Sequence, residues 1–256
     1  MIDILAAAFL LSLVLLGIHS YFGLEIIKRG IIFTDLAIGQ MSAFGAAAAV
    51  LFFDGRYIYP IALAFALGAA FLNSLAARRE KHLEAFIGLL YAFGVSGVYI
   101  LLSQSPHGME EFQNLLAADI LFTPMSKIIR VGILYFFLGL FIFFINKKTS
   151  GFIKDFLFFT TFAFTVTSSV QLAGVFVVFS LLIGPAFVAL KIRKGKGKRH
   201  LVITAWVVGL AVNLIAIAAS YHFDLPTGYT IVFLHALTAM VFSFTSRADR
   251  NPKPPG

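Results

Sequence analysis

A carboxylate, an amide and an imidazole stand inside stretches of this sequence that are otherwise apolar. Asp35 and Gln40 lie five positions apart in GIIFTDLAIGQMSAFGAAAAVLFF, and His19 belongs to the apolar stretch before it. An ionisable side chain in such a stretch is costly to bury, so it usually faces a cavity or a partner. Carboxylate oxygens and imidazole nitrogens bind divalent transition metals, and a neutral oxygen can assist them. We therefore predict a weak site that binds and releases a metal ion, with Asp35, Gln40 and His19 as candidate ligands.

Asp35 and His19 each have a plainer interpretation. Asp35 follows Arg29 by six positions, so it can be a carboxylate at the start of a helix, where the helix dipole stabilises negative charge. His19 can be a packed histidine that is bonded to a neighbouring helix. It does not share a helical face with Glu25, because the two residues are six positions apart. The sequence leaves both alternatives open.

A second group of candidate ligands lies in the long connection SQSPHGMEEFQNLLAADILFTP. It contains His107, Glu110, Glu111 and Asp119, which together could attract a divalent cation and pass it on. The same surface would dock an external binding protein. Alternatively, EEFQNLLAADIL lies along the membrane interface as an amphipathic helix, and this is the interpretation that we favour.

Two prolines and their neighbours are candidate structural residues. Pro185 in LLIGPAFVAL should kink its helix, or end one helix and start another. In DLPTGYT, Pro226 stiffens a turn and Gly228 permits unusual backbone angles. Asp224 and Thr227 can cap the helix that follows.

The composition places these residues in a membrane protein. The 256 residues are 60% hydrophobic and 12% charged, with a mean hydropathy of +0.93. A soluble domain is nearer to half apolar and a quarter charged. The apolar residues form runs of the length that a membrane-spanning helix needs. We predict an all-α polytopic protein with about nine spans, at about 3–24, 31–53, 57–77, 85–103, 129–146, 155–171, 173–191, 201–220 and 228–246.

The basic residues predict how these spans are oriented. Positive charge gathers in every second connection, and such connections are usually cytoplasmic. The N-terminus is therefore expected outside, as a retained first helix, and the C-terminus inside. Residues 1–246 form one transmembrane domain, and residues 247–256 form a disordered cytoplasmic tail. Nine spans are preferred because one fewer would break the alternation. The basic connections include Lys28, Arg29, Arg78, Arg79, Lys81, Lys147, Lys148, Lys154 and KIRKGKGKRH.

Several classes of function are disfavoured. The net charge of +8 lies in the connections rather than on one face, which argues against nucleic-acid binding. Without cysteine there is no thiolate ligand. The sequence contains no Walker A loop, HExxH or GxSxG motif, so we expect a transporter rather than an enzyme, with no catalytic residues.

Four segments in order resemble the permease subunits of zinc/manganese ABC importers, the ABC-3 family. They are GIHSYFGLEIIKRGIIFTDLAIGQMSAFG, SPHGMEEFQNLLAADIL, SVQLAGVFVVFSLLIGPAFVAL and DLPTGYTIVFLHAL. The resemblance covers about residues 15–245. It implies a homodimer in the cell (inner) membrane, with the path at the dimer interface, a cytoplasmic ABC ATPase that hydrolyses ATP and an extracytoplasmic metal-binding protein. The metal ion is then cargo, with no permanently bound cofactor, and lipid surrounds the chain.

The sequence departs from the family pattern at two places. Most members have a histidine where Gln40 stands. The connection after the fifth span is shorter than usual, because NKKTSGFIKDFLFF runs directly into the next span. This shortened connection favours an alternative, a secondary transporter or channel that needs no ATPase. A cobalamin- or siderophore-type permease is a third possibility, which the short chain disfavours.

Overall fold

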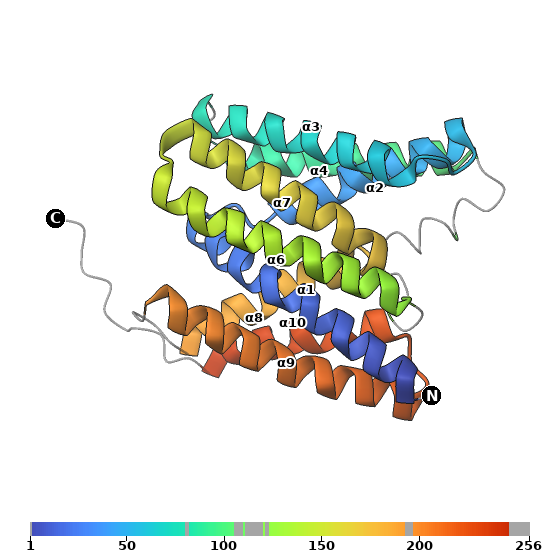
Figure 1. Cartoon of the computed structure of the whole chain (residues 1–256), viewed down its shortest axis with the longest axis vertical. Helices are drawn as coiled ribbons and strands as arrows, with labels where there is room; N and C mark the ends of the chain where they lie inside the picture. Colours follow the sequence, from blue (N-terminus) through green and yellow to red (C-terminus); the bar gives the residue numbers. More distant parts are fainter. Residues whose placement is uncertain are drawn as a thin grey trace.

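The computed structural model describes residues 2–79, 82–104, 110, 120, 123–192 and 197–245. Within these ranges the chain forms nine helices that are long and apolar enough to cross a membrane, as predicted (Figure 1). Their apolar segments have 18–26 residues, or about 27–39 Å at ~1.5 Å per residue. The helices are α1 (Ile2–Arg29), α2 (Thr34–Phe53), α3 (Ile58–Arg79), α4 (Leu83–Leu102), α6 (Met125–Lys148), α7 (Gly151–Ala173), α8 (Val175–Ile192), α9 (Lys198–Phe223) and α10 (Thr227–Thr245).

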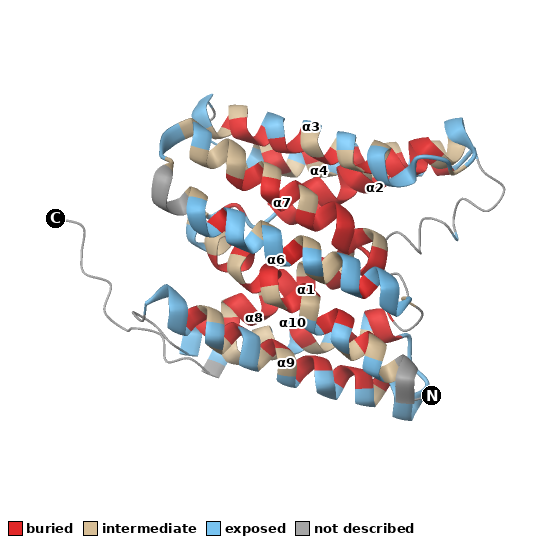
Figure 2. Ribbon diagram, viewed as in Figure 1, coloured by how far each residue is buried: buried red, intermediate tan, exposed pale blue. Residues whose placement is uncertain are grey.

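The helices pack as two groups. Helix α2 packs against α3, α4 and α7, whereas α8 packs against α1, α9 and α10. Figure 1 shows these groups at opposite ends of the molecule, with α6 between them in that view. Helix α2 is largely enclosed, and burial is concentrated on the faces that the helices turn toward one another (Figure 2). The candidate residues of α2 therefore lie in the interior of one group.

Small residues allow the helices of both groups to approach closely. A Cβ atom added at Gly45 of α2 would lie 2.7 Å from the Ile61 carbonyl oxygen of α3. One added at Gly23 of α1 would lie 1.9 Å from the Leu182 carbonyl oxygen of α8. In lipid, helices gain little from burying apolar surface, so such backbone proximity and van der Waals contact hold them together.

Large apolar side chains cover much of the outer surface. Phe136 and Phe137 of α6 are 68% and 60% exposed, and Phe244 of α10 is 89% exposed. Soluble proteins rarely expose contiguous apolar surface of this kind. A bilayer would cover these side chains, in agreement with the membrane location that the composition predicts.

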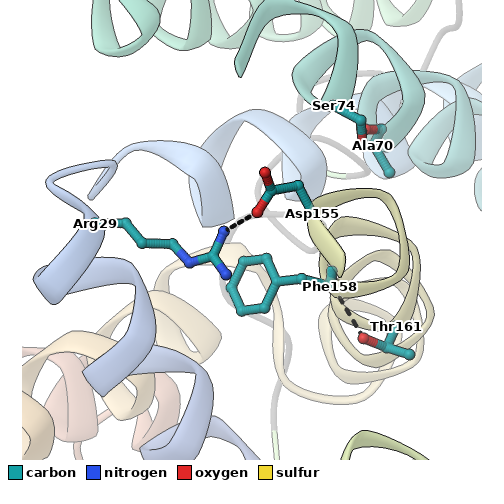
Figure 3. Close-up of polar contacts among 6 residues, drawn as sticks. All are labelled: Arg29, Ala70, Ser74, Asp155, Phe158 and Thr161. Carbon is teal, nitrogen blue, oxygen red and sulfur yellow. Dashed lines mark hydrogen bonds and ion pairs between the residues drawn. The ribbon is translucent and has the colours of Figure 1, made fainter. Parts of the chain in front are cut away.

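Basic side chains from several helices meet at one end of the bundle. The Arg29 guanidinium pairs with Asp155 of α7 at 2.7 Å and lies 4.2 Å from the centre of the Phe158 ring (Figure 3). Lys198 of α9 pairs with Glu25 of α1, also at 2.7 Å. The end of α1 and the starts of α7 and α9 therefore lie on the same side, as the alternation of charge predicts. The cytoplasmic location of this basic end stays a prediction.

Reporter fusions can test that orientation. A reporter inserted near Gly197 and another after Gly256 should both be cytoplasmic, because basic connections are retained inside. A reporter near Gly108 should be external. The same location for the reporters at Gly108 and Gly197 would contradict both the span count and the orientation.

The structure corrects several local expectations. Helix α8 continues through Pro185, so this residue does not end a helix. Asp224 adopts a left-handed conformation, with φ of 52°, and terminates α9 rather than capping α10. Gly228 lies within α10 and does not have the unusual backbone angles that we predicted. The Thr227 hydroxyl bonds to the Ser220 hydroxyl at 2.6 Å, so it ties the start of α10 to α9. The chain changes direction between α9 and α10 without a glycine, because Asp224 itself adopts the left-handed conformation.

The connection between α7 and α8 is shorter than the segment TSSVQLAG that we expected to form it. Helix α7 includes residues 167–173, and Gly174 alone separates it from α8. Gly174 has a φ of 81°, which side chains with a Cβ rarely adopt. The polar residues of the segment therefore belong to a helix and face its neighbours.

Candidate functional site

Asp35 lies buried in the first turn of α2. It is the second residue of that helix and is 1% exposed. Neither of its carboxylate oxygens has a hydrogen-bond partner among the described residues. The helix-start position that the sequence suggested is confirmed, and the helix dipole favours a carboxylate there. This position alone does not account for the burial, because a charged carboxylate removed from water needs a partner or a bound cation, and without either it takes up a proton.

Gln40 is also buried without a hydrogen-bond partner, but it leaves α2 in another direction. It is 1% exposed, and neither amide atom is bonded within the described part of the chain. A Cβ atom added at Gly94 of α4 would lie 3.0 Å from the Gln40 Cβ, so Gln40 faces α4. Five positions correspond to about 140° around a helix and ~7.5 Å along it. Asp35 and Gln40 therefore do not share a face, and a single site that uses both stays a prediction.

Two further buried polar residues, Thr34 next to Asp35 and Asn73 on α3, were not identified from the sequence. The Thr34 hydroxyl and both amide atoms of Asn73 lack a hydrogen-bond partner among the described residues. Each of these two side chains is 0% exposed. Asn73 lies in the stripe Ala62, Ala66, Ala69, Asn73 and Ala76 on the buried side of α3. An amide within a stripe of alanines at helical spacing is the sequence signal that would have identified it.

His19 takes part in a buried hydrogen-bond network between α1, α6 and α7. Its Nδ1 donates to the Leu15 carbonyl oxygen at 2.7 Å, and its Nε2 lies 3.2 Å from the Ser169 hydroxyl. The Tyr135 hydroxyl bonds to Ser169 and, at 3.1 Å, to Ser168. The structure therefore places His19 as the packed histidine of the alternative interpretation. Its role as a metal ligand is not tested by this geometry.

A groove of about 1070 Å³ on the surface of α1, α6 and α9 contains none of these candidate ligands. Its lining is mainly apolar. Trp206 and Gly17 both belong to this lining, and the Trp206 side chain donates a hydrogen bond to the Gly17 carbonyl oxygen at 3.0 Å. Tyr135 links this groove to the His19 network. Such a lining suits contact with lipid rather than ion binding.

Comparison with known proteins identifies the family. The model of the family described as "ABC 3 transport family" matches residues 1–246. The chain belongs to the ABC-3 transport family. The resemblance noted from the four sequence segments is thus confirmed, and this ABC-3 chain is a multi-pass protein of the cell membrane.

Individual relatives are more distant. A membrane protein of Haemophilus influenzae, named for an iron transport system, is 39% identical over 74 residues, which are 29% of this chain and 27% of that protein. A membrane protein of Cyanophora paradoxa is 26% identical over 196 residues, which are 70% of this chain and 65% of that protein. The ABC-3 chain thus aligns with about a quarter of the first relative and less than two thirds of the second.

Two solved structures share the fold of the ABC-3 chain. PsaBC from Streptococcus pneumoniae matches with a TM-score of 0.72 at 19% identity, over 96% of this chain and 93% of that one. A protein described as a metal-chelate-type ABC transporter, in an inward-facing conformation, matches with a TM-score of 0.70 at 15% identity, over 93% of this chain and 85% of that one. At these identities the likeness concerns the fold alone.

The external candidates of the ABC-3 chain lie largely outside the described residues. Glu110 is described and exposed, whereas His107, Glu111 and Asp119 are not among the residues that the structure describes. Within the described ranges, no three His, Asp or Glu side chains gather closely enough to hold a metal ion.

Proposed function

We propose that this chain is the membrane-spanning permease subunit of an ABC importer for divalent transition metal ions. The observation that carries the proposal is Asp35, a buried carboxylate without a hydrogen-bond partner among the described residues, on the largely enclosed helix α2. A transported cation needs a negatively charged group that binds it temporarily on an otherwise neutral path, and the ion must be able to leave again. One carboxylate assisted by neutral oxygens provides binding without a closed, permanent site.

The proposal names zinc and manganese as cargo, with iron as a third candidate. Asp35 and neutral amide oxygens accept all three ions, so their chemistry does not choose among them. The name of the Haemophilus influenzae relative includes iron transport. Metal uptake by cells with and without this chain, measured for the three metals in parallel, tests the proposal. Equal uptake of every metal in both strains would contradict it.

The proposed partners are a cytoplasmic ABC ATPase, an extracytoplasmic metal-binding protein and a second copy of this chain. ATP hydrolysis belongs to the ATPase, and the permease supplies the path. An ATPase would contact the basic end of the bundle through residues around 147–155 and 191–200. The pairs Arg29–Asp155 and Lys198–Glu25 support this arrangement, since they hold the starts of α7 and α9 against the end of α1.

A transporter or channel without an ATPase is the second candidate function. It is favoured by the connection between α6 and α7, where Thr149 and Ser150 alone lie between the two helices. So short a connection presents little surface to a docking ATPase.

Purification from the native membrane separates these candidates. We expect the chain to retain an ABC ATPase in near-equal amount after mild solubilisation, because ion pairs hold the starts of α7 and α9 against the end of α1. The measurement is the ratio of the two subunits after gel filtration. Metal uptake by a chain that carries no ATPase would favour the second candidate function.

A further inference from the structure

The contact between α2 and α3 fixes how the two helices are aligned. A Cβ atom added at Gly45 would lie 2.8 Å from the Ala62 Cα, so these residues mark a close crossing point. The helices run antiparallel, since only residues 54–57 connect them. Thr34 lies eleven residues before Gly45, and Asn73 lies eleven residues after Ala62. Both therefore lie at the same level, ~16 Å from the crossing point.

The helical period also turns the two residues toward each other. Eleven residues make just over three complete helical turns, with an excess rotation of only about 20°. Thr34 thus lies on the face of α2 that carries Gly45, and Asn73 lies on the face of α3 that carries Ala62. Burial agrees with this alignment, because Thr34 and Asn73 are both 0% exposed. Asp35 follows Thr34 directly and lies at nearly the same level, but its side chain leaves α2 about 100° further round the helix. Gly39, one turn later on nearly the same side, faces Val166 and Val170 of α7. Asp35 therefore points toward the side of α2 on which α7 lies.

These side chains form an oxygen-rich group that lacks internal partners. The Thr34 hydroxyl, the Asp35 carboxylate and the Asn73 amide have no hydrogen-bond partner among the described residues. The next residue on α3 behaves differently, since the Ser74 hydroxyl donates to the Ala70 carbonyl oxygen at 2.7 Å (Figure 3). Polar groups buried in a protein are normally bonded, and unbonded ones call for a functional explanation.

We propose that Asn73 and Thr34 join Asp35 in one oxygen-lined site for a divalent cation where α2, α3 and α7 meet, since α7 packs against both other helices. This inference rests on the proposed function and adds two ligands to it. A carboxylate, an amide oxygen and a hydroxyl suit a hard cation such as Mn²⁺, with water completing the coordination. The site needs no second carboxylate and no imidazole, and this composition would let the ion leave.

Binding of Mn²⁺ to the purified full-length chain tests the site. Electron paramagnetic resonance measures the free ion directly, with Mn²⁺ as the probe. We expect Asn73→Ala to weaken binding by about ten-fold, or ~1.4 kcal/mol, because an oxygen ligand is lost. Ser74→Ala is the matched control, since it removes a neighbouring buried hydroxyl that is bonded within its own helix. Equal affinity of the two variants would overturn the inference.

Two further variants distinguish a ligand from a packing residue. Asn73→Asp should bind Mn²⁺ more tightly than the unchanged chain, because it adds a carboxylate to the site. The exchange variant Asp35→Asn/Asn73→Asp should recover binding that Asp35→Asn loses, since the charge then lies on the facing helix. A residue that only packs would give neither result.

The outcomes separate this inference from the proposed function. Weaker binding by Asp35→Asn, with every Asn73 variant behaving like Ser74→Ala, would overturn the shared site of Thr34, Asp35 and Asn73. Asp35 would then remain as the residue that binds the cation. No Mn²⁺ binding and no metal uptake by the unchanged chain would overturn both.

Discussion

Asp35→Asn is expected to lower metal uptake by about ten-fold or more while the protein remains folded. The substitution preserves the size of the side chain and its capacity for hydrogen bonds, but it removes the charge. A carboxylate contributes more than an amide to binding a divalent cation, so transport should fall sharply. Folding should survive, because an unpaired buried carboxylate stabilises nothing, and its removal can even raise stability.

The measurement is uptake of labelled zinc or manganese, divided by the amount of protein in the membrane. Gln40→Ala provides the comparison and should reduce uptake less, since a neutral oxygen contributes less to the cation. Full uptake by Asp35→Asn would mean that this residue is only a carboxylate at a helix start. The path would then have to be sought around His19 and Asp119.

Gly23→Ala should strongly damage the packing of α1 against α8. The added Cβ would lie 1.9 Å from the Leu182 carbonyl oxygen, which belongs to a helix backbone and cannot turn aside. Helices α1 and α8 would have to separate. Overpacking of this kind costs roughly 1–3 kcal/mol, and occasionally more. We expect a marked loss of folded protein after solubilisation.

Gly17→Ala is the matched control on the same helix. A Cβ atom at Gly17 would meet nothing within 4 Å, so it should leave packing unchanged and gain up to ~1 kcal/mol of helix propensity. Thermal unfolding of both variants in detergent, followed by gel filtration, gives the comparison. Similar unfolding temperatures would show that α1 and α8 are not held by close backbone contact at Gly23.

Hydropathy and charge alone determined the membrane class and the nine spans. Every predicted span corresponds to a helix, because a run of about 20 apolar residues has few other stable forms in a bilayer. Asp35 was also identified from the sequence, since a carboxylate within such a run is conspicuous. The predictions failed where chain direction depends on single residues. Asp224, rather than Gly228, supplies the left-handed turn before α10.

The residues that could accompany Asp35 depend on the tertiary structure. Sequence spacing suggested Gln40, but Gln40 faces α4, whereas Asn73 on α3 lies at the level of Thr34 and Asp35. The period of a helix gives the direction of each side chain around its own axis, and it does not say which neighbour covers that direction. In lipid the neighbour is chosen by close contacts of small residues such as Gly45 with Ala62. Those contacts depend on how two surfaces fit together, so the alignment of Asn73 with Thr34 emerges only when the helices are packed.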